Sequence, residues 1–156
     1  MTVHFYYKYK EDIVKQLQYF YAKELKDLDE IRQQKAQLDE AEHQIRMYYE
    51  DLRTAIADIS EVSKGEVLYE EGEDFILQLT IHKNYLKFIR TPHAIEVVIG
   101  RHRIRENDTE VLIESYIVPG DKRCVIKKKG TMHQGSHFDS GSIDAYMREI
   151  FGHKQV

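Results

Sequence analysis

The stretch IRQQKAQLDEAEHQI, residues 31–45, decides the N-terminal half of the fold, because it places Ile31, Leu38 and Ile45 seven residues apart among mostly polar residues. Apolar side chains at this spacing share one side of an α-helix. The spacing keeps one phase over about six heptads. A companion register three residues earlier comprises Val14, Tyr21, Leu28, Lys35, Glu42, Tyr49 and Ile56. The pattern predicts a long helix with a partner-helix seam at Leu17, Ile31, Leu38, Ile45, Leu52 and Ile59.

The length of this helix raises the question of what covers it. Residues 1–64 contain no Gly, Pro or Asn, whereas all eight glycines and both prolines follow. A helix from roughly residue 10 to 63 would be about 80 Å long, more than a sheet built from the remaining chain can cover. Two arrangements therefore stay open. The unbroken phase favours a continuous coiled-coil helix that pairs with its copy, and the alternative is a helical hairpin with a turn within Gln33–Glu42. A third interpretation is that the helix only covers the core.

Residues 65–156 change to a period of two, which is typical of strands. FILQLTI, residues 75–81, and AIEVVIG, residues 94–100, both alternate apolar with more polar side chains. Clusters of turn formers divide the region into six strands, expected at residues 66–71, 75–82, 85–91, 94–103, 109–118 and 122–129. Short connections join antiparallel strands, so we predict an antiparallel meander and exclude a doubly wound nucleotide-binding fold.

A short helix is expected at the C-terminus. SIDAYMREIFG, residues 142–152, carries apolar side chains on one helical face, with Ser142 as the predicted N-cap and Gly152 as the stop. The side chains expected to pack on the sheet are Tyr146, Met147, Ile150 and Phe151. The predicted class is therefore α+β, with residues 1–64 as a helical coiled-coil arm and residues 65–156 as a sheet domain that ends in a helix.

The closing motif DAYMREIFG, Asp144–Gly152, resembles the ends of small uncharacterised proteins of similar length from Bacillus and relatives. These proteins share the helix-sheet-helix order, and their family has no known function. The resemblance implies a bacterial protein, and it implies no activity or site residue.

The composition and net charge are typical of an ordinary soluble protein. The 23 Lys and Arg against 27 Asp and Glu give a net charge of -4, which argues against a protein that binds polyanions over its whole surface. Cys124 is the only cysteine, so no intramolecular disulfide can form, which fits a reducing compartment. The N-terminus lacks a signal pattern, and no run approaches the ~18 apolar residues of a membrane span. We expect a cytoplasmic protein without membrane contact.

No recognisable active site emerges from the motifs. Neither phosphate-binding glycine pattern is present, and Cys124 lies in an apolar run that is typical of a buried small hydrophobe. His133, His137 and Asp139, with His153 behind them, offer metal-ligand chemistry, but they lie in a Gly/Ser-rich loop without zinc-ligand spacing. We therefore predict no catalytic residue, no metal and no cofactor.

A basic sheet edge is the main charged feature. In a meander, the strands at 94–103 and 122–129 run in the same direction, so their ends are expected to meet at one edge. The anion-binding candidates at this edge are Arg101, Arg103, Arg105, Lys127, Lys128 and Lys129. The alternative is a solvated rim neutralised by neighbouring carboxylates.

The features together favour a non-enzymatic interaction or regulatory protein. The long seam would form a homodimer or capture a partner protein. The alternatives are a nucleic-acid-associated protein that uses the basic edge, and a small metal-dependent enzyme that uses the histidine loop.

Overall fold

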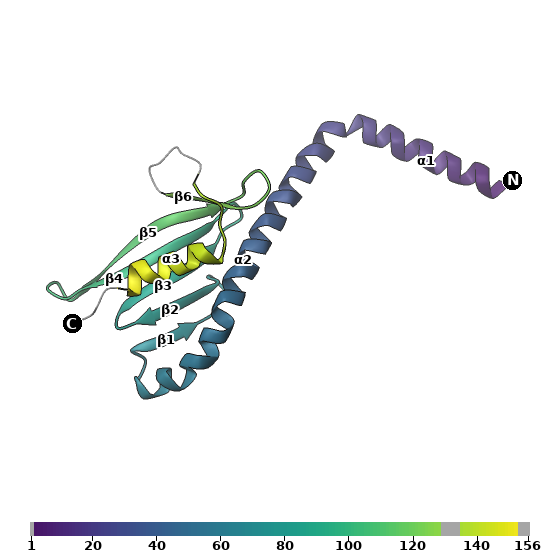
Figure 1. The fold of residues 1–156 in the computed structure, drawn as a ribbon. Helices are drawn as coiled ribbons and strands as arrows, with labels where there is room; N and C mark the ends of the chain where they lie inside the picture. The colour runs from purple at the N-terminus through teal and green to yellow at the C-terminus, as the bar shows by residue number, and fades with distance from the viewer. Residues whose placement is uncertain (1, 129–134, 153–156) are drawn as a thin grey trace. The chain divides into compact units, whose positions relative to one another are not determined.

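The computed structural model describes residues 2–128 and 135–152, with side chains from residue 8 onward. The chain divides into two compact units, an N-terminal unit of residues 1–34 and a sheet unit of residues 35–156. Its elements follow the predicted α+β order of helix, antiparallel sheet and short helix (Figure 1). The predicted boundary near residue 64 marks the change from helix to strand, whereas the compact units separate thirty residues earlier, between Gln34 and Lys35.

Two helices precede the sheet. Helix α1 spans Thr2–Phe20 and helix α2 spans Ala22–Val62, with a turn at Tyr21 between them. Tyr21 still donates its N–H to the Leu17 carbonyl and accepts from the N–H of Leu25, both at 2.9 Å. The hairpin alternative is wrong, because α2 runs without a turn through residues 33–42. The fully continuous helix is also corrected, since it is interrupted at Tyr21.

The end of α2 has a clear backbone cause. Lys64 and Gly65 both adopt left-handed backbone conformations, with φ of 54° and 87°. The Gly65 N–H then bonds back to the Ser60 carbonyl at 3.3 Å, which satisfies one of the carbonyls that the helix end leaves free. Gly65 is the first glycine in the chain. The helix therefore ends at the first position where a left-handed backbone conformation carries little steric cost.

The sheet is the predicted six-stranded antiparallel meander, with strand order β1-β2-β3-β4-β5-β6. The strands are β1 Val67–Glu70, β2 Leu77–Ile81, β3 Asn84–Arg90, β4 Ile95–Arg103, β5 Asp108–Val118 and β6 Val125–Lys128. All six lie within three residues of their predicted bounds. The register between β4 and β5 shifts at Val97 and Val98, which marks a β-bulge.

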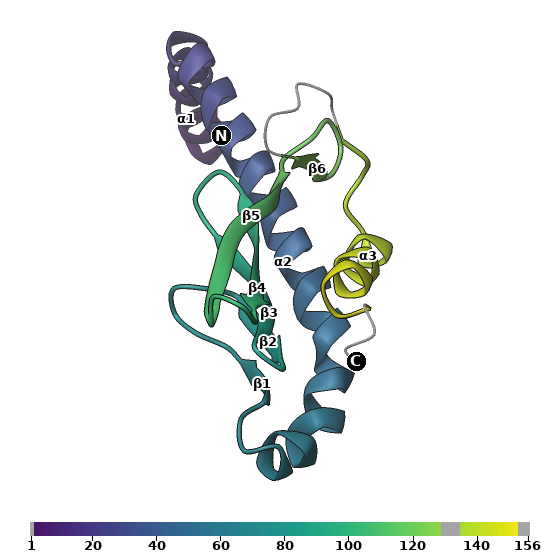
Figure 2. The same ribbon diagram turned by 90° about the vertical axis from the view of Figure 1, so that its left-hand side faces the viewer.

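The core lies on one face of the sheet, where the C-terminal part of α2 and helix α3, Ser140–Phe151, lie side by side (Figure 2). Tyr48 of α2 donates a hydrogen bond to Asp144 of α3 at 2.8 Å, and the Tyr49 hydroxyl contacts the Met147 sulfur at 3.1 Å. The buried helix side chains include Leu38, Ala41, Ile45, Tyr49, Ile143, Tyr146 and Ile150, and those from the strands include Leu77, Leu79, Leu86, Phe88, Ile95, Val97, Ile99 and Ile117. The alternating strand pattern therefore faces the helices.

Helix α3 begins three residues earlier than a Ser142 N-cap would give. Asp139 is the N-cap, and Ser142 completes a reciprocal capping box from the third helical position. Gly152 is the C-cap, as predicted, and its N–H bonds to the Arg148 carbonyl at 2.9 Å. Tyr146 and Ile150 are buried, as expected. Met147 and Phe151 are only partly buried against the core.

Candidate interaction site

One side of the N-terminal unit carries apolar side chains that are exposed in the described part of the chain. The apolar stripe comprises Val14, Leu17, Tyr21, Leu25, Leu28 and Ile31, and their exposed fractions range from 40% at Leu28 to 61% at Ile31. All but Ile31 line one open apolar groove of about 400 Å³, together with Gln18 and Glu24. A contiguous apolar surface of this kind is typical of a site that another molecule covers.

The energetics of the helix point in the same direction. Every side chain that the structure describes from residue 8 to residue 36 is exposed. Helices in proteins gain most of their stability from packing an apolar face against another element, rather than from intrinsic helix propensity. The N-terminal unit therefore lacks, among its described residues, the packing that normally holds such a helix.

The seam predicted from the seven-residue spacing divides into two parts. Leu17 and Ile31 belong to the apolar stripe, whereas Leu38 and Ile45 are only 1% and 0% exposed and lie in the core of the sheet unit. Leu52 is partly buried against the same core. For these three residues the partner-helix interpretation is corrected, because their own sheet already covers them. Ile59, near the end of α2, is 47% exposed.

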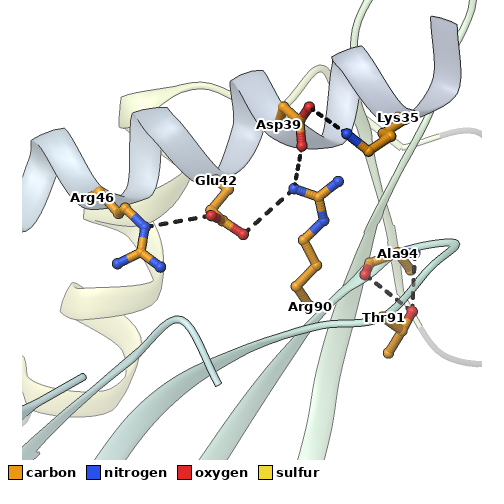
Figure 3. A network of polar contacts seen from close by, with 7 residues as sticks. All are labelled: Lys35, Asp39, Glu42, Arg46, Arg90, Thr91 and Ala94. Atoms are coloured by element: carbon orange, nitrogen blue, oxygen red, sulfur yellow. Dashed lines mark hydrogen bonds and ion pairs between the residues drawn. The ribbon is translucent and has the colours of Figure 1, made fainter. Parts of the chain in front are cut away.

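A polar network fixes α2 to the sheet just where burial begins (Figure 3). The guanidinium of Arg90, at the end of β3, lies 2.6 Å from a carboxylate oxygen of Asp39 and 3.5 Å from one of Glu42. The hydrogen bond from Arg90 holds the pKa of Asp39 below its usual value. Lys35 and Arg46 extend the network along α2 through pairs with the same two carboxylates. Lys35 and Glu42, the two charged residues of the companion register, therefore have a role in the sheet unit.

A second tie joins α2 to the β5–β6 connection. The Gln37 side chain donates to the Gly120 carbonyl at 3.2 Å and accepts from the Gly120 N–H at 2.9 Å. The Gln37 amide therefore satisfies both the N–H and the C=O of Gly120, two backbone groups that need a hydrogen-bond partner. No feature of the sequence predicts this contact, because Gln37 resembles its polar neighbours along the helix.

The predicted basic edge does not assemble among the described residues. Arg101 lies opposite Glu110 of β5, and Lys128 lies opposite Ser115. Glu110 and Ser115 are five positions apart along β5, which separates the two levels by about 17 Å. The cause is that β5 has 11 residues and β6 only 4, so β6 pairs with the far half of β5. Lys129 lies outside the described residues.

The cations at the two levels have acidic neighbours. Arg101 pairs with Glu149 at 3.6 Å and Arg103 pairs with Glu110 at 3.3 Å. At the other level, Lys128 lies 3.8 Å from Glu114. Arg105 lies in the exposed β4–β5 turn, and Lys127 is exposed on β6. This arrangement corresponds to the solvated, partly neutralised rim rather than to one concentrated cationic surface.

The histidine loop shows no metal site in the part that is described. His133 and His153 lie outside the described residues, while Asp139 caps helix α3 and His137 lies with its Nδ1 atom 2.6 Å from the Arg123 guanidinium. Residues 2–128 and 135–152 contain no group of three or more His, Cys, Asp or Glu side chains that would hold a metal ion. A guanidinium neighbour also disfavours a metal cation at His137.

A small cavity adjoins the only cysteine. Its volume is about 240 Å³, and its lining includes Cys124, Phe138 and Gln44. Cys124 is 4% exposed, and burial raises the pKa of its thiol to about 11, so the thiol stays protonated at neutral pH. The Oε1 atom of Gln44 is buried without a hydrogen-bond partner among the described residues. This volume is below the range of typical ligand pockets.

Within the described residues, no helix combines the length and the hydropathy that a membrane crossing requires. No protein-family model, curated protein or solved structure matches the chain. The resemblance of Asp144–Gly152 to Bacillus proteins therefore stays a prediction, and the apolar stripe is the feature on which a functional proposal rests.

Proposed function

We propose that this protein is a non-enzymatic interaction protein that binds a partner helix through the apolar stripe of its N-terminal unit. The observation that carries the proposal is the exposure of the six stripe residues along one side of α1 and the start of α2. Partner binding removes this surface from water and supplies the packing that the helix lacks.

The difference in burial between the N-terminal unit and the later part of α2 supports the same function. From Leu38 onward, one side of α2, which includes Leu38, Ile45 and Tyr49, packs on the chain's own sheet, and the Arg90 network fixes that part in place. The sheet unit thus has its own core, and the stripe has no role in it. A segment that is apolar but unnecessary for the fold is typical of a binding surface.

The experiment that tests this function compares two variants of the N-terminal unit. Leu17→Asp combined with Leu28→Asp places charges in the stripe, and they would be desolvated in any helix interface. Tyr19→Asp is the matched control, because Tyr19 is a large side chain that is 87% exposed and lies outside the stripe. We expect the double variant to lose self-association or the partner captured from its native cell, and Tyr19→Asp to retain it.

The same experiment can overturn the proposal. The stripe is not an interaction site if the wild-type protein is monomeric and the stripe variant captures the same proteins as the wild type. Near-UV circular dichroism of the tyrosines controls for folding, because the sheet unit should be unchanged in both variants.

A further inference from the structure

The apolar stripe is complementary to itself when two copies run in opposite directions, and we propose that its partner is a second copy of this chain in an antiparallel helix pair. This inference rests on the proposed function and adds the identity and the direction of the partner. Its basis is the order of residues along the stripe and the charges that flank it.

The apolar layers match over the whole stripe. In an antiparallel pair, the residues of one seven-residue register face those of the companion register on the other helix. Aligning Leu17 with Leu28 of the second copy also sets Val14 against Ile31 of the second copy, and the two-fold symmetry repeats both layers. Four layers therefore place exposed apolar side chains against each other.

The central layers decide the direction. Glu24 is the one charged residue that lines the apolar groove. In the antiparallel alignment, Glu24 faces Tyr21 of the second copy, whose phenol can donate a hydrogen bond to the carboxylate. In a parallel pair with the same residues in register, Glu24 would instead face its own copy. Two like charges would then be desolvated without a partner.

The flanking charges agree with the antiparallel alignment. Glu11 and Arg32 are both exposed, and they flank the stripe at positions that would meet between the two copies, once at each end. A parallel pair would gain a different exposed pair, Asp27 with Arg32 of the second copy. Exposed pairs of this kind contribute little, so they do not offset two opposed Glu24 carboxylates.

The position of the symmetry axis fits the helix interruption. The alignment places the two-fold axis between Ala22 and Lys23, next to the turn at Tyr21 where α1 gives way to α2. The groove at this junction is lined from both helices, by Val14 and Leu17 before the turn and by Leu25 and Leu28 after it. The bulky Tyr21 of each copy would therefore be placed at the centre of the pair.

Cysteine cross-linking distinguishes the two directions. We would introduce Leu17→Cys and Leu28→Cys separately into full-length protein that carries Cys124→Ser, and oxidise each variant alone and as a mixture. In the antiparallel pair neither variant cross-links to itself, and the mixture gives a disulfide-linked dimer. Lys26→Cys, on the other side of the same helix, is the control and should not cross-link with either variant.

Charge reversal supplies an independent readout of the register. Glu11→Arg and Arg32→Glu should each raise the dimer Kd about five- to tenfold, and the double variant should return it near the wild-type value, because the pair is restored with its charges exchanged. Self-cross-linking of each cysteine variant, or a double variant as weak as the singles, would overturn the antiparallel pair. A parallel dimer would leave the proposed function intact, whereas wild-type protein that neither dimerises nor retains any partner would refute both.

Discussion

Ile31 and Ile45 occupy equivalent positions two heptads apart, and the structure gives them opposite surroundings. Ile31 is 61% exposed in the N-terminal unit, and Ile45 is 0% exposed in the core of the sheet unit. Truncating each to Ala removes the same three carbon atoms. The two variants therefore form a matched pair that asks whether one sequence pattern serves two separate purposes.

The expected cost follows from the burial. At ~0.8 kcal/mol for each buried carbon, Ile45→Ala loses about 2.4 kcal/mol of transfer free energy. The cavity that remains brings the total to about 2–5 kcal/mol. Ile31→Ala should change the free energy of unfolding of the sheet unit by less than about 0.5 kcal/mol. The same substitution should weaken self-association, because it removes contact area from the stripe.

Urea unfolding followed by near-UV circular dichroism measures both costs. The chain has eleven tyrosines and no tryptophan, and Tyr49 and Tyr146 report on the core directly. Dilute protein separates the stability of the sheet unit from association. Equal losses for the two variants, or a loss below about 1 kcal/mol for Ile45→Ala, would refute the division of the register into a core part and a binding part.

Three further predictions concern the sheet unit, and urea unfolding checks each. Tyr146→Phe should cost about 1–3 kcal/mol, because it leaves the buried Ser115 hydroxyl without its partner, and adding Ser115→Ala should recover part of that loss. Gly100→Ala should destabilise the sheet by about 1–3 kcal/mol, because a Cβ atom would overlap the Tyr85 ring, and the penalty should nearly vanish in a Tyr85→Ala background. Burial raises the pKa of Tyr48 and Tyr146 to about 12, above the value near 10 of an unfolded tyrosine. The stability from these neutral phenols should be fully present below pH 10 and lost as the pH rises to 12, and a flat profile would contradict the burial.

The sheet was predictable because its signals are local. Alternating apolar residues and clustered turn formers placed all six strands, and short connections left only a meander. The N-cap of α3 was harder to predict, because Asp139 and Ser142 both suit an N-cap position. Only the structure shows that the two residues form one capping box. The length of β6 was the least accurate part of the prediction. The short β6 pairs with the far half of β5, which separates the cations that the topology alone had placed together.

The site was predictable only in part, because its periodicity is ambiguous. A stripe repeating every seven residues suits both a helix that lies on a sheet and a helix that pairs with another helix, and Leu38 and Ile45 proved to be of the first kind. The polarity of the N-terminal residues does not indicate that the exposed part of the register differs from the part that packs on the sheet. The two parts differ in whether the sheet packs against them, and the contacts of Arg90 with Asp39 and Glu42 mark where this packing begins. These contacts join residues about fifty positions apart, so the local sequence does not indicate them.

The mass of the intact protein in solution tests the central claim most directly. Multi-angle light scattering over a range of concentrations should give twice the 18.5 kDa chain mass at high micromolar protein. Leu17→Asp with Leu28→Asp should return the mass to that of one chain with the sheet unit still folded, and Tyr19→Asp should leave the dimer intact. A wild-type protein that stays at 18.5 kDa at every concentration, and retains no partner through the stripe, would contradict the account.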